Sequence, residues 1–159
     1  MADQPSLEDV AAAWRYLTDP ETDLALGLGL HPGVLDRLVD KAMGLLDAGR
    51  STESEALLEK LCVVDLRTVT TPFLLGALKA ARSDHAGAVV AYSEAVRRAG
   101  TRPDPVFLSR VYLCRGEARA LSGDAAGAKD DFENVLGLAE SDPTITRQVE
   151  RRVAVLAED

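Results

Sequence analysis

The sequence predicts an all-α fold made of repeated helix pairs, and three observations lead to that prediction. Helix-breaking turns recur at Gly49, Ser83 and Gly123, which lie 34 and 40 residues apart. Each break is followed, at fixed distances, by a small side chain, a large apolar one and another apolar one. The chain also lacks a sustained alternation of apolar and polar residues, which a half-buried strand would need.

The positions that recur around each break fit the packing of one helix against another. The small residues are Ser54, Ala88 and Ala128, the large ones are Leu58, Tyr92 and Phe132, and the small residues on the preceding helices are Ala42, Gly76 and Gly116. Small residues allow two helices to approach closely, and large ones fill the space toward the next pair. A helix–turn–helix period of about 34 residues is the signature of tetratricopeptide repeats. We therefore predict a tetratricopeptide-repeat helical solenoid of three helix pairs, with an N-terminal helix and a C-terminal capping helix, and we assign these nine residues to repeat packing.

Over residues 1–33, the sequence predicts one helix followed by a flexible segment. The helix is expected over 6–18, where one apolar face recurs at helical spacing. That face consists of Leu7, Val10, Ala11, Trp14 and Leu17. The apolar stretch 24–30 contains two glycines, each of which weakens a helix by about 1 kcal/mol relative to alanine. We expect 19–33 to be mobile or to need a partner.

The repeats are expected over 34–142 and the capping helix over 143–159. We place the three repeats at 34–67, 68–101 and 106–140. The interval from Ser83 to Gly123 is six residues longer than the one from Gly49 to Ser83, and the Pro- and Gly-rich turn between the second and third repeats contains these extra residues. A stack needs a last helix to cover its final repeat. The apolar face of that helix consists of Ile145, Val149, Val153 and Leu156.

Stacked helix pairs form a concave groove, which the first helix of each pair lines. The expected groove residues are Val39, Met43 and Leu46 in the first repeat, Phe73, Ala77 and Ala80 in the second, and Arg110, Leu113, Glu117 and Leu121 in the third. This mostly apolar lining suits an extended apolar segment of a protein partner. Groove and core roles both stay open for Val39, Phe73 and Leu113. For Glu117, a place at the solvent rim and a polar contact to the partner both stay open.

Composition and charge exclude several function classes. A net charge of −8 and a pI near 4.8 disfavour nucleic-acid binding, which depends on neutralising phosphates. The chain has no uncharged apolar run of about 18 residues that could span a membrane. Its N-terminus lacks the basic start and apolar core of a secretory signal. We therefore expect a cytoplasmic location, with Cys62 and Cys114 as reduced thiols.

No motif predicts catalysis, a cofactor or a metal site. His31 and His85 lie in predicted turns, and no His or Cys spacing is typical of metal ligands. Asp130 and Asp131 are adjacent, and adjacent helical residues point about 100° apart. We therefore interpret this acidic pair as part of a solvated face. The sequence predicts a protein-binding protein rather than an enzyme.

Residues 58–92 and the segment after them carry a more specific pattern. A Leu-rich helix ends in Leu61-Cys62-Val63-Val64-Asp65, and Phe73-Leu74-Leu75-Gly76-Ala77 and a small-residue helix containing Tyr92 follow. A lengthened loop, Pro105-Val106-Phe107 and a helix containing Cys114 come next. In this order, over about 34–140, these features resemble the class II chaperones of type III secretion systems, which protect hydrophobic translocator proteins.

This resemblance implies a bacterial, cytoplasmic, non-enzymatic chaperone without a cofactor. Such a protein holds a membrane-inserting secretion substrate soluble before export by covering an extended apolar segment. Members of the family dimerise through their N-terminal helical region. The candidate dimerisation residues are Leu7, Val10, Trp14 and Leu17, with docking of Trp14 on the first repeat as an equal alternative. The alternative function is that of a general scaffold joining two cellular proteins.

Overall fold

The computed structural model describes residues 8, 10–12, 32–65, 68–100, 104–138 and 143–156, which form helices and turns without a strand. The helices are α2 (Pro32–Asp47), α3 (Ser51–Val64), α4 (Thr70–Ala81), α5 (His85–Ala99), α6 (Pro105–Leu121), α7 (Ala125–Leu138) and α8 (Pro143–Leu156). This arrangement confirms the predicted all-α class. The chain divides into two compact units, Met1–Thr71 and Pro72–Asp159, which are described separately.

In the first unit, α2 and α3 pack together through a pair of small residues. Ala42 and Ser54 are both fully buried. The Ser54 hydroxyl donates a hydrogen bond to the Ala42 carbonyl oxygen, with an Oγ–O distance of 2.8 Å. This bond satisfies a hydroxyl group that would be costly to bury unpaired. Leu38 of α2 and Leu58 of α3 are buried in the same unit.

The aspartate that closes the Leu-Cys-x-x-Asp pattern ends α3. Asp65 is 2 % exposed, and its backbone N–H donates to the Leu61 carbonyl oxygen over 2.8 Å. Its carboxylate accepts a hydrogen bond from the Thr68 hydroxyl over 3.1 Å, and Thr68 is also hydrogen-bonded to Thr71 at the start of α4. Asp65 therefore holds the residues that follow α3 within the first unit.

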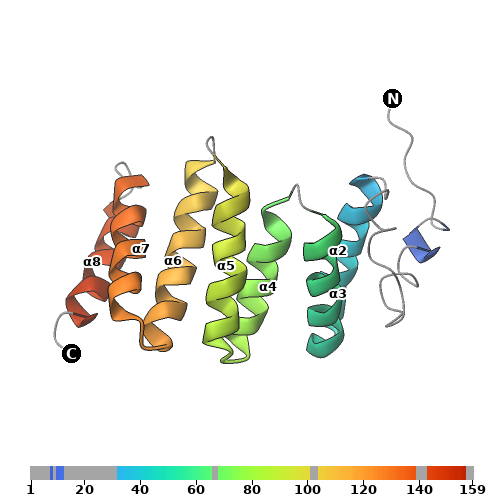
Figure 1. The fold of residues 1–159 in the computed structure, drawn as a ribbon, viewed down its shortest axis with the longest axis horizontal. Helices are drawn as coiled ribbons and strands as arrows, with labels where there is room; N and C mark the ends of the chain where they lie inside the picture. The colour runs from blue at the N-terminus through green and yellow to red at the C-terminus, as the bar shows by residue number, and fades with distance from the viewer. Residues whose placement is uncertain are drawn as a thin grey trace. The chain divides into compact units, whose positions relative to one another are not determined.

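In the second unit, α4 to α8 follow one another side by side in chain order (Figure 1). Two glycines set the closeness of neighbouring helices. A Cβ added at Gly76 would lie 2.6 Å from Cδ1 of Tyr92, and one added at Gly116 would lie 2.7 Å from Cε1 of Phe132. The rings of Tyr92 and Phe132 are buried. Each glycine on a first helix thus leaves the space that an aromatic ring of the second helix fills.

The small residues that the sequence pairs with these glycines are buried as well. Ala88 and Ala128 are fully buried. The atoms nearest to an added Cβ nevertheless belong to the rings of Tyr92 and Phe132 rather than to these alanines. The close approach is therefore between glycine and ring, one helical turn from the small pair that the pattern suggests.

The three breaks adopt the same turn. A backbone N–H bonds the carbonyl oxygen five residues earlier in each, from Arg50 to Leu45, from Asp84 to Lys79 and from Asp124 to Arg119. This bond belongs to the Schellman motif, whose central residue is left-handed. The central φ values are 76° at Gly49, 64° at Ser83 and 88° at Gly123. Glycine meets this requirement without strain, whereas Ser83 adopts a conformation that is costly for a residue with a Cβ.

The next helix begins on an aspartate after two of these turns. Oδ1 of Asp84 accepts from the N–H of Gly87, and Oδ1 of Asp124 accepts from the N–H of Gly127, both over 2.9 Å. A Cβ at either glycine would overlap the capping carboxylate. Gly87 and Gly127 thus leave the space that the capping carboxylate occupies. The cap satisfies a backbone N–H at the start of the helix that would otherwise be unpaired.

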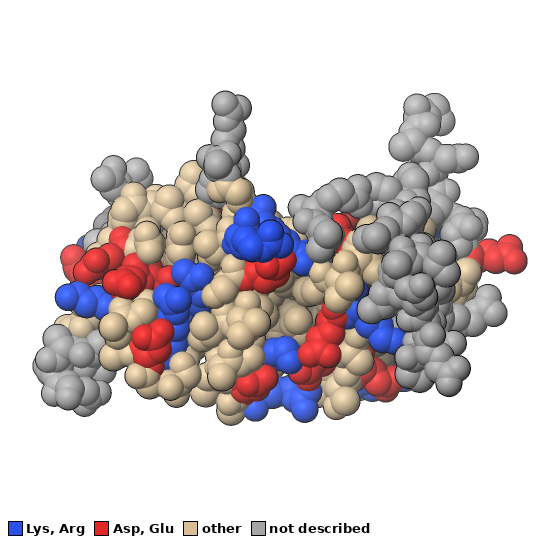
Figure 2. Space-filling model, viewed as in Figure 1, with Lys and Arg blue, Asp and Glu red and all other residues tan. Residues whose placement is uncertain are grey.

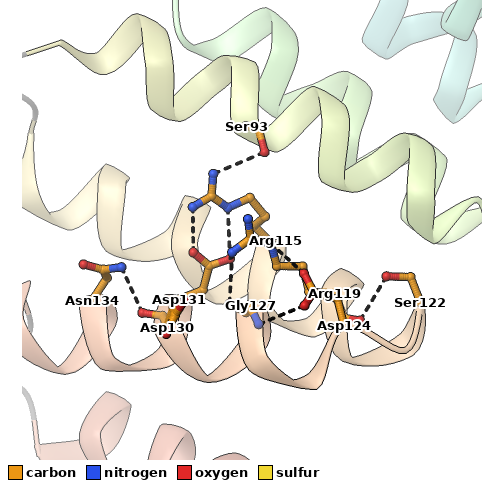
Figure 3. A network of polar contacts seen from close by, with 9 residues as sticks. All are labelled: Ser93, Arg115, Arg119, Ser122, Asp124, Gly127, Asp130, Asp131 and Asn134. Atoms are coloured by element: carbon orange, nitrogen blue, oxygen red, sulfur yellow. Dashed lines mark hydrogen bonds and ion pairs between the residues drawn. The ribbon is translucent and has the colours of Figure 1, made fainter.

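A buried ion-pair network ties α5, α6 and α7 together (Figure 3). Asp131 of α7 is fully buried, and Arg115 of α6 binds both its oxygens, with N–O distances of 2.9 and 2.6 Å. Arg119 binds the same carboxylate over 3.1 Å and also donates to the Gly127 carbonyl oxygen over 3.0 Å. Arg115 further donates to the Ser93 hydroxyl of α5 over 3.2 Å. The network fixes the orientation of α6.

The buried position of Asp131 overturns the interpretation of the acidic pair as a solvated face. Asp130 is exposed, as expected, but Asp131 points into the helix interface. Residues adjacent on a helix point about 100° apart, so one of the pair faces solvent while the other faces α6. Arg115 and Arg119, one turn apart on α6, supply the compensating charge that the sequence pattern alone did not connect to Asp131.

The last helix covers the third pair. Val149 of α8 is fully buried in a cluster with Ala128, Phe132 and Val135, and Val153 packs against it. The side chains of Ile145 and Leu156 lie outside the described residues. So do Leu7, Trp14, Leu17 and the segment 19–31, while Val10 is helical and partly buried. The role of the N-terminal residues in dimerisation stays a prediction.

We predict that Gly116→Ala lowers the free energy of unfolding by about 1–3 kcal/mol, because the new methyl group overlaps the Phe132 ring. Gly137→Ala is the matched control, since an added Cβ there has no neighbour within 4 Å. The control should be more stable than wild type by about 0.5–1 kcal/mol through helix propensity. Urea unfolding of both variants measures the difference. Stabilisation by both substitutions would contradict the close approach of α6 and α7.

We predict that Asp131→Ala destabilises the fold by about 3–5 kcal/mol, because it leaves the largely buried guanidinium of Arg115 without its counter-charge. Asp130→Ala, one residue away and exposed, should change stability by less than about 0.5 kcal/mol. Thermal unfolding followed by circular dichroism compares the two variants. Similar melting temperatures for both would show that the network does not hold α6 and α7 together.

Candidate partner-binding surface

The predicted groove residues of the first unit are reachable from solvent. Val39, Met43 and Leu46 of α2 are all partly buried. Their spacing of four and three residues places them on one face of the helix. Part of each side chain is buried within the first unit, and the rest of its apolar area is exposed to solvent. Their contact with a partner stays a prediction.

The predicted groove residues of α4 and α6 belong to the second unit, and we call them the α4/α6 surface. They are Phe73, Ala77, Ala80, Arg110, Leu113, Glu117 and Leu121. Arg110, Ala77 and Leu121 are exposed, Leu121 by 67 %, and the other four are partly buried. The surface therefore combines anchored side chains with open ones.

Phe73 lies in an aromatic cluster that spans three helices. Its ring centroid is 5.8 Å from that of Tyr92 on α5 and 5.3 Å from that of Phe107 on α6, the latter in an edge-to-face arrangement. Such pairs contribute about 0.5–1.5 kcal/mol beyond the apolar area they bury. Phe73 and Phe107 are both partly buried. Phe73 is thus neither a free groove residue nor a fully buried core residue, and it joins the surface to the core.

Leu113 and Glu117 differ in what holds them. Leu113 packs against the cluster of Phe132 and Val149, so most of its side chain is covered. Glu117 forms an ion pair with Arg152 of α8, with an Oε1–Nη2 distance of 2.6 Å. Their side chains are 33 % and 42 % exposed, so solvent screens this pair. Glu117 therefore has a partner within the chain, which neither sequence interpretation of it included.

The thiol of Cys114 is partly buried and interacts with the Tyr92 hydroxyl. Burial and then the Glu117 carboxylate raise the pKa of Cys114 above its usual value. Burial is also the largest cause that raises the pKa of Tyr92, followed by Cys114. A catalytic cysteine needs a lowered pKa, because the thiolate is the nucleophile. Cys114 is therefore suited to packing rather than to nucleophilic chemistry.

The described residues offer few means for metal or membrane chemistry. No group of three or more His, Cys, Asp or Glu side chains among them could hold a metal ion. None of the described helices is both long and apolar enough to cross a bilayer. Cys62 and Cys114 are not joined in a disulfide. His85 lies at the start of α5, and His31 is outside the described residues.

Two residues of this region were missed by sequence reasoning. Phe107 belongs to the Pro-x-Phe pattern, and its spacing from Phe73 gave no sign that the two rings meet. Arg152 lies 35 residues beyond Glu117 on another helix, and no local periodicity connects them. Both contacts depend on how successive helix pairs stack, which a single-helix pattern does not encode.

Solved structures share this fold. PcrH of Pseudomonas aeruginosa, in complex with the chaperone-binding region of PopD, matches with a TM-score of 0.69 and 19 % identity over 82 % of this chain and 96 % of that chain. The Yersinia enterocolitica type III secretion chaperone SycD, in complex with a peptide of the translocator YopD, matches with a TM-score of 0.65 and 19 % identity over 82 % and 94 %. The first tetratricopeptide domain of Spaghetti (RPAP3), bound to an HSP90 peptide, gives a TM-score of 0.64 and 21 % identity over 77 % and 93 %.

These likenesses concern the fold. No protein-family model matches the chain. No curated protein is similar to it in sequence. The chain therefore has the tetratricopeptide-repeat fold, and its structural neighbours include the class II translocator chaperones of type III secretion that its sequence resembles.

Proposed function

We propose that this chain is a chaperone that binds an extended apolar segment of a hydrophobic secreted protein and keeps that protein soluble before export. Two neighbours of its fold, PcrH and SycD, were solved with segments of PopD and YopD. The ordered pattern from Leu61 to Cys114 supports the same class of function. An exposed apolar segment aggregates unless something covers it, and a repeat surface can cover it without chemistry.

The observation that carries the proposal is the partly buried ring of Phe73 beside the open methyl group of Ala77. These residues are four apart on α4 and so lie on one side of that helix. The Phe73 ring packs against the rings of Tyr92 and Phe107. These contacts fix its position before a partner binds. A preordered apolar surface loses less entropy on binding.

The small size of Ala77 matters for an extended partner. A small side chain next to a ring lets the backbone of a segment approach, while alternate side chains of that segment point toward the protein. Apolar area removed from water contributes roughly 25 cal/mol per Å². We assign the same role to Val39, Met43 and Leu46 in the first unit, on the strength of their partly exposed apolar side chains.

We predict that Ala77→Glu weakens partner binding at least about tenfold while leaving the fold intact. The position is exposed, so the fold tolerates the charge. A bound apolar segment would instead bury the carboxylate unpaired, at a cost well above the 1.4 kcal/mol that corresponds to tenfold. Ala86→Glu makes the same change at an exposed position of α5 and serves as the matched control.

The measurement is affinity capture from cells that naturally produce the chain, with mass spectrometry of the captured proteins and circular dichroism of each variant. Wild type and Ala86→Glu should recover a protein with long apolar segments, and Ala77→Glu should not. Undiminished capture by Ala77→Glu would refute this surface. Capture of soluble regulatory proteins alone would favour a general scaffold over a secretion chaperone.

A further inference from the structure

One side of α6 carries a mixed row of charged and apolar residues. Arg110, Cys114, Glu117 and Leu121 follow one another at spacings of four, three and four, which places them along one stripe of the helix. Arg110 is exposed at one end of the stripe and Leu121 at the other. The α4/α6 surface is therefore not uniformly apolar.

Three charged groups act on the middle of this stripe. The Glu117 carboxylate raises the pKa of the Cys114 thiol, and the guanidinium groups of Arg110 and Arg152 act in the opposite direction. Glu117 and Arg152 are paired at 2.6 Å. Within the described residues, Arg110 has no ion-pair partner. Glu117 is thus already paired, while Arg110 is an exposed guanidinium group on the same side of α6.

The exposed cation of Arg110 contrasts with the acidic net charge of the chain as a whole. The protein carries a net charge of −8. On the face drawn in Figure 2, acidic and basic side chains of the described residues are interspersed with uncharged surface. Arg110 is an exposed cation beside the apolar residues Leu113 and Phe107, which are partly buried on the same helix. A cation there is available to a bound segment rather than committed to the fold.

We propose that Arg110 binds an Asp or Glu side chain of the partner segment. The proposal rests on the proposed function, because it concerns the same bound segment. Arg110 supplies planar N–H donors that match a carboxylate in two-point geometry. Glu117 is already paired with Arg152, so Arg110 stays available to an incoming carboxylate. The partner is therefore an apolar segment that carries an acidic residue at a fixed distance from its apolar anchors.

We expect the ion pair between Arg110 and the partner's carboxylate to determine which segments bind, while it adds little to the affinity. A solvent-exposed ion pair changes binding by about two- to fivefold and weakens as salt screens it. Its main effect is to reject segments with Lys or Arg at that place and to fix the register of the segment.

The test is selection from a displayed library of random 12-residue segments on immobilised wild type, Arg110→Gln and Arg151→Gln proteins. Arg151 is exposed on α8 next to Arg152 and is the matched control for the loss of one positive charge. Wild type and Arg151→Gln should enrich Asp or Glu at one spacing from apolar residues, and Arg110→Gln should not. A Glu→Gln change in one selected peptide should then lower affinity about two- to fivefold for wild type and leave Arg110→Gln unaffected.

The outcomes separate the two proposals. Enrichment of apolar residues without an acidic position, or an acidic preference that survives in Arg110→Gln, would overturn the role of Arg110 and leave the proposed function standing. Selection without any enrichment of apolar residues would overturn both.

Discussion

The close approach of a glycine to an aromatic ring is the constraint on which the second unit depends. Gly76 faces Tyr92, and Gly116 faces Phe132, at distances that leave no room for a Cβ. Because packed interiors tolerate little change in volume, the spacing of α4 from α5 and of α6 from α7 follows from these two pairs. Phe132 also anchors the cluster that Val149 of α8 joins. These glycine–ring contacts therefore determine how closely the helices of the second unit pack.

The same constraint prepares the surface that we propose for binding. Tyr92 fills the space above Gly76 and presents its ring to Phe73, which in turn meets Phe107 of the following pair. The exposed part of Phe73 is therefore the outer end of a chain of contacts that starts in the core. Arg115 and Arg119 act on the other side of α6, where Asp131 holds them. Arg115 and Arg119 are thus committed to the fold, whereas Arg110 and Leu121 of the same helix are exposed, and we propose these for partner binding.

Sequence periodicity was sufficient for the helices because their determinants are local. The breaks at Gly49, Ser83 and Gly123 each form the left-handed turn that ends a helix, and only neighbouring backbone groups are involved. Asp131 was misjudged because its burial depends on arginines of another helix, 12 and 16 residues away. The ion pair between Glu117 and Arg152 was not predicted for the same reason, because the two residues lie on different helices. Partners between helices follow from three-dimensional stacking, which helical periodicity does not specify.

An apolar surface alone is a poor selector of partners. Apolar contacts are non-directional, so an extended segment can slide along such a surface with little change in free energy. A chaperone for one substrate therefore needs a directional contact, and a polar group at one end of the surface supplies it at small cost in affinity. Arg110 meets this requirement because it is exposed, and because Glu117 is already paired with Arg152. We therefore propose that the aromatic cluster around Phe73 provides most of the affinity and that Arg110 provides the selectivity.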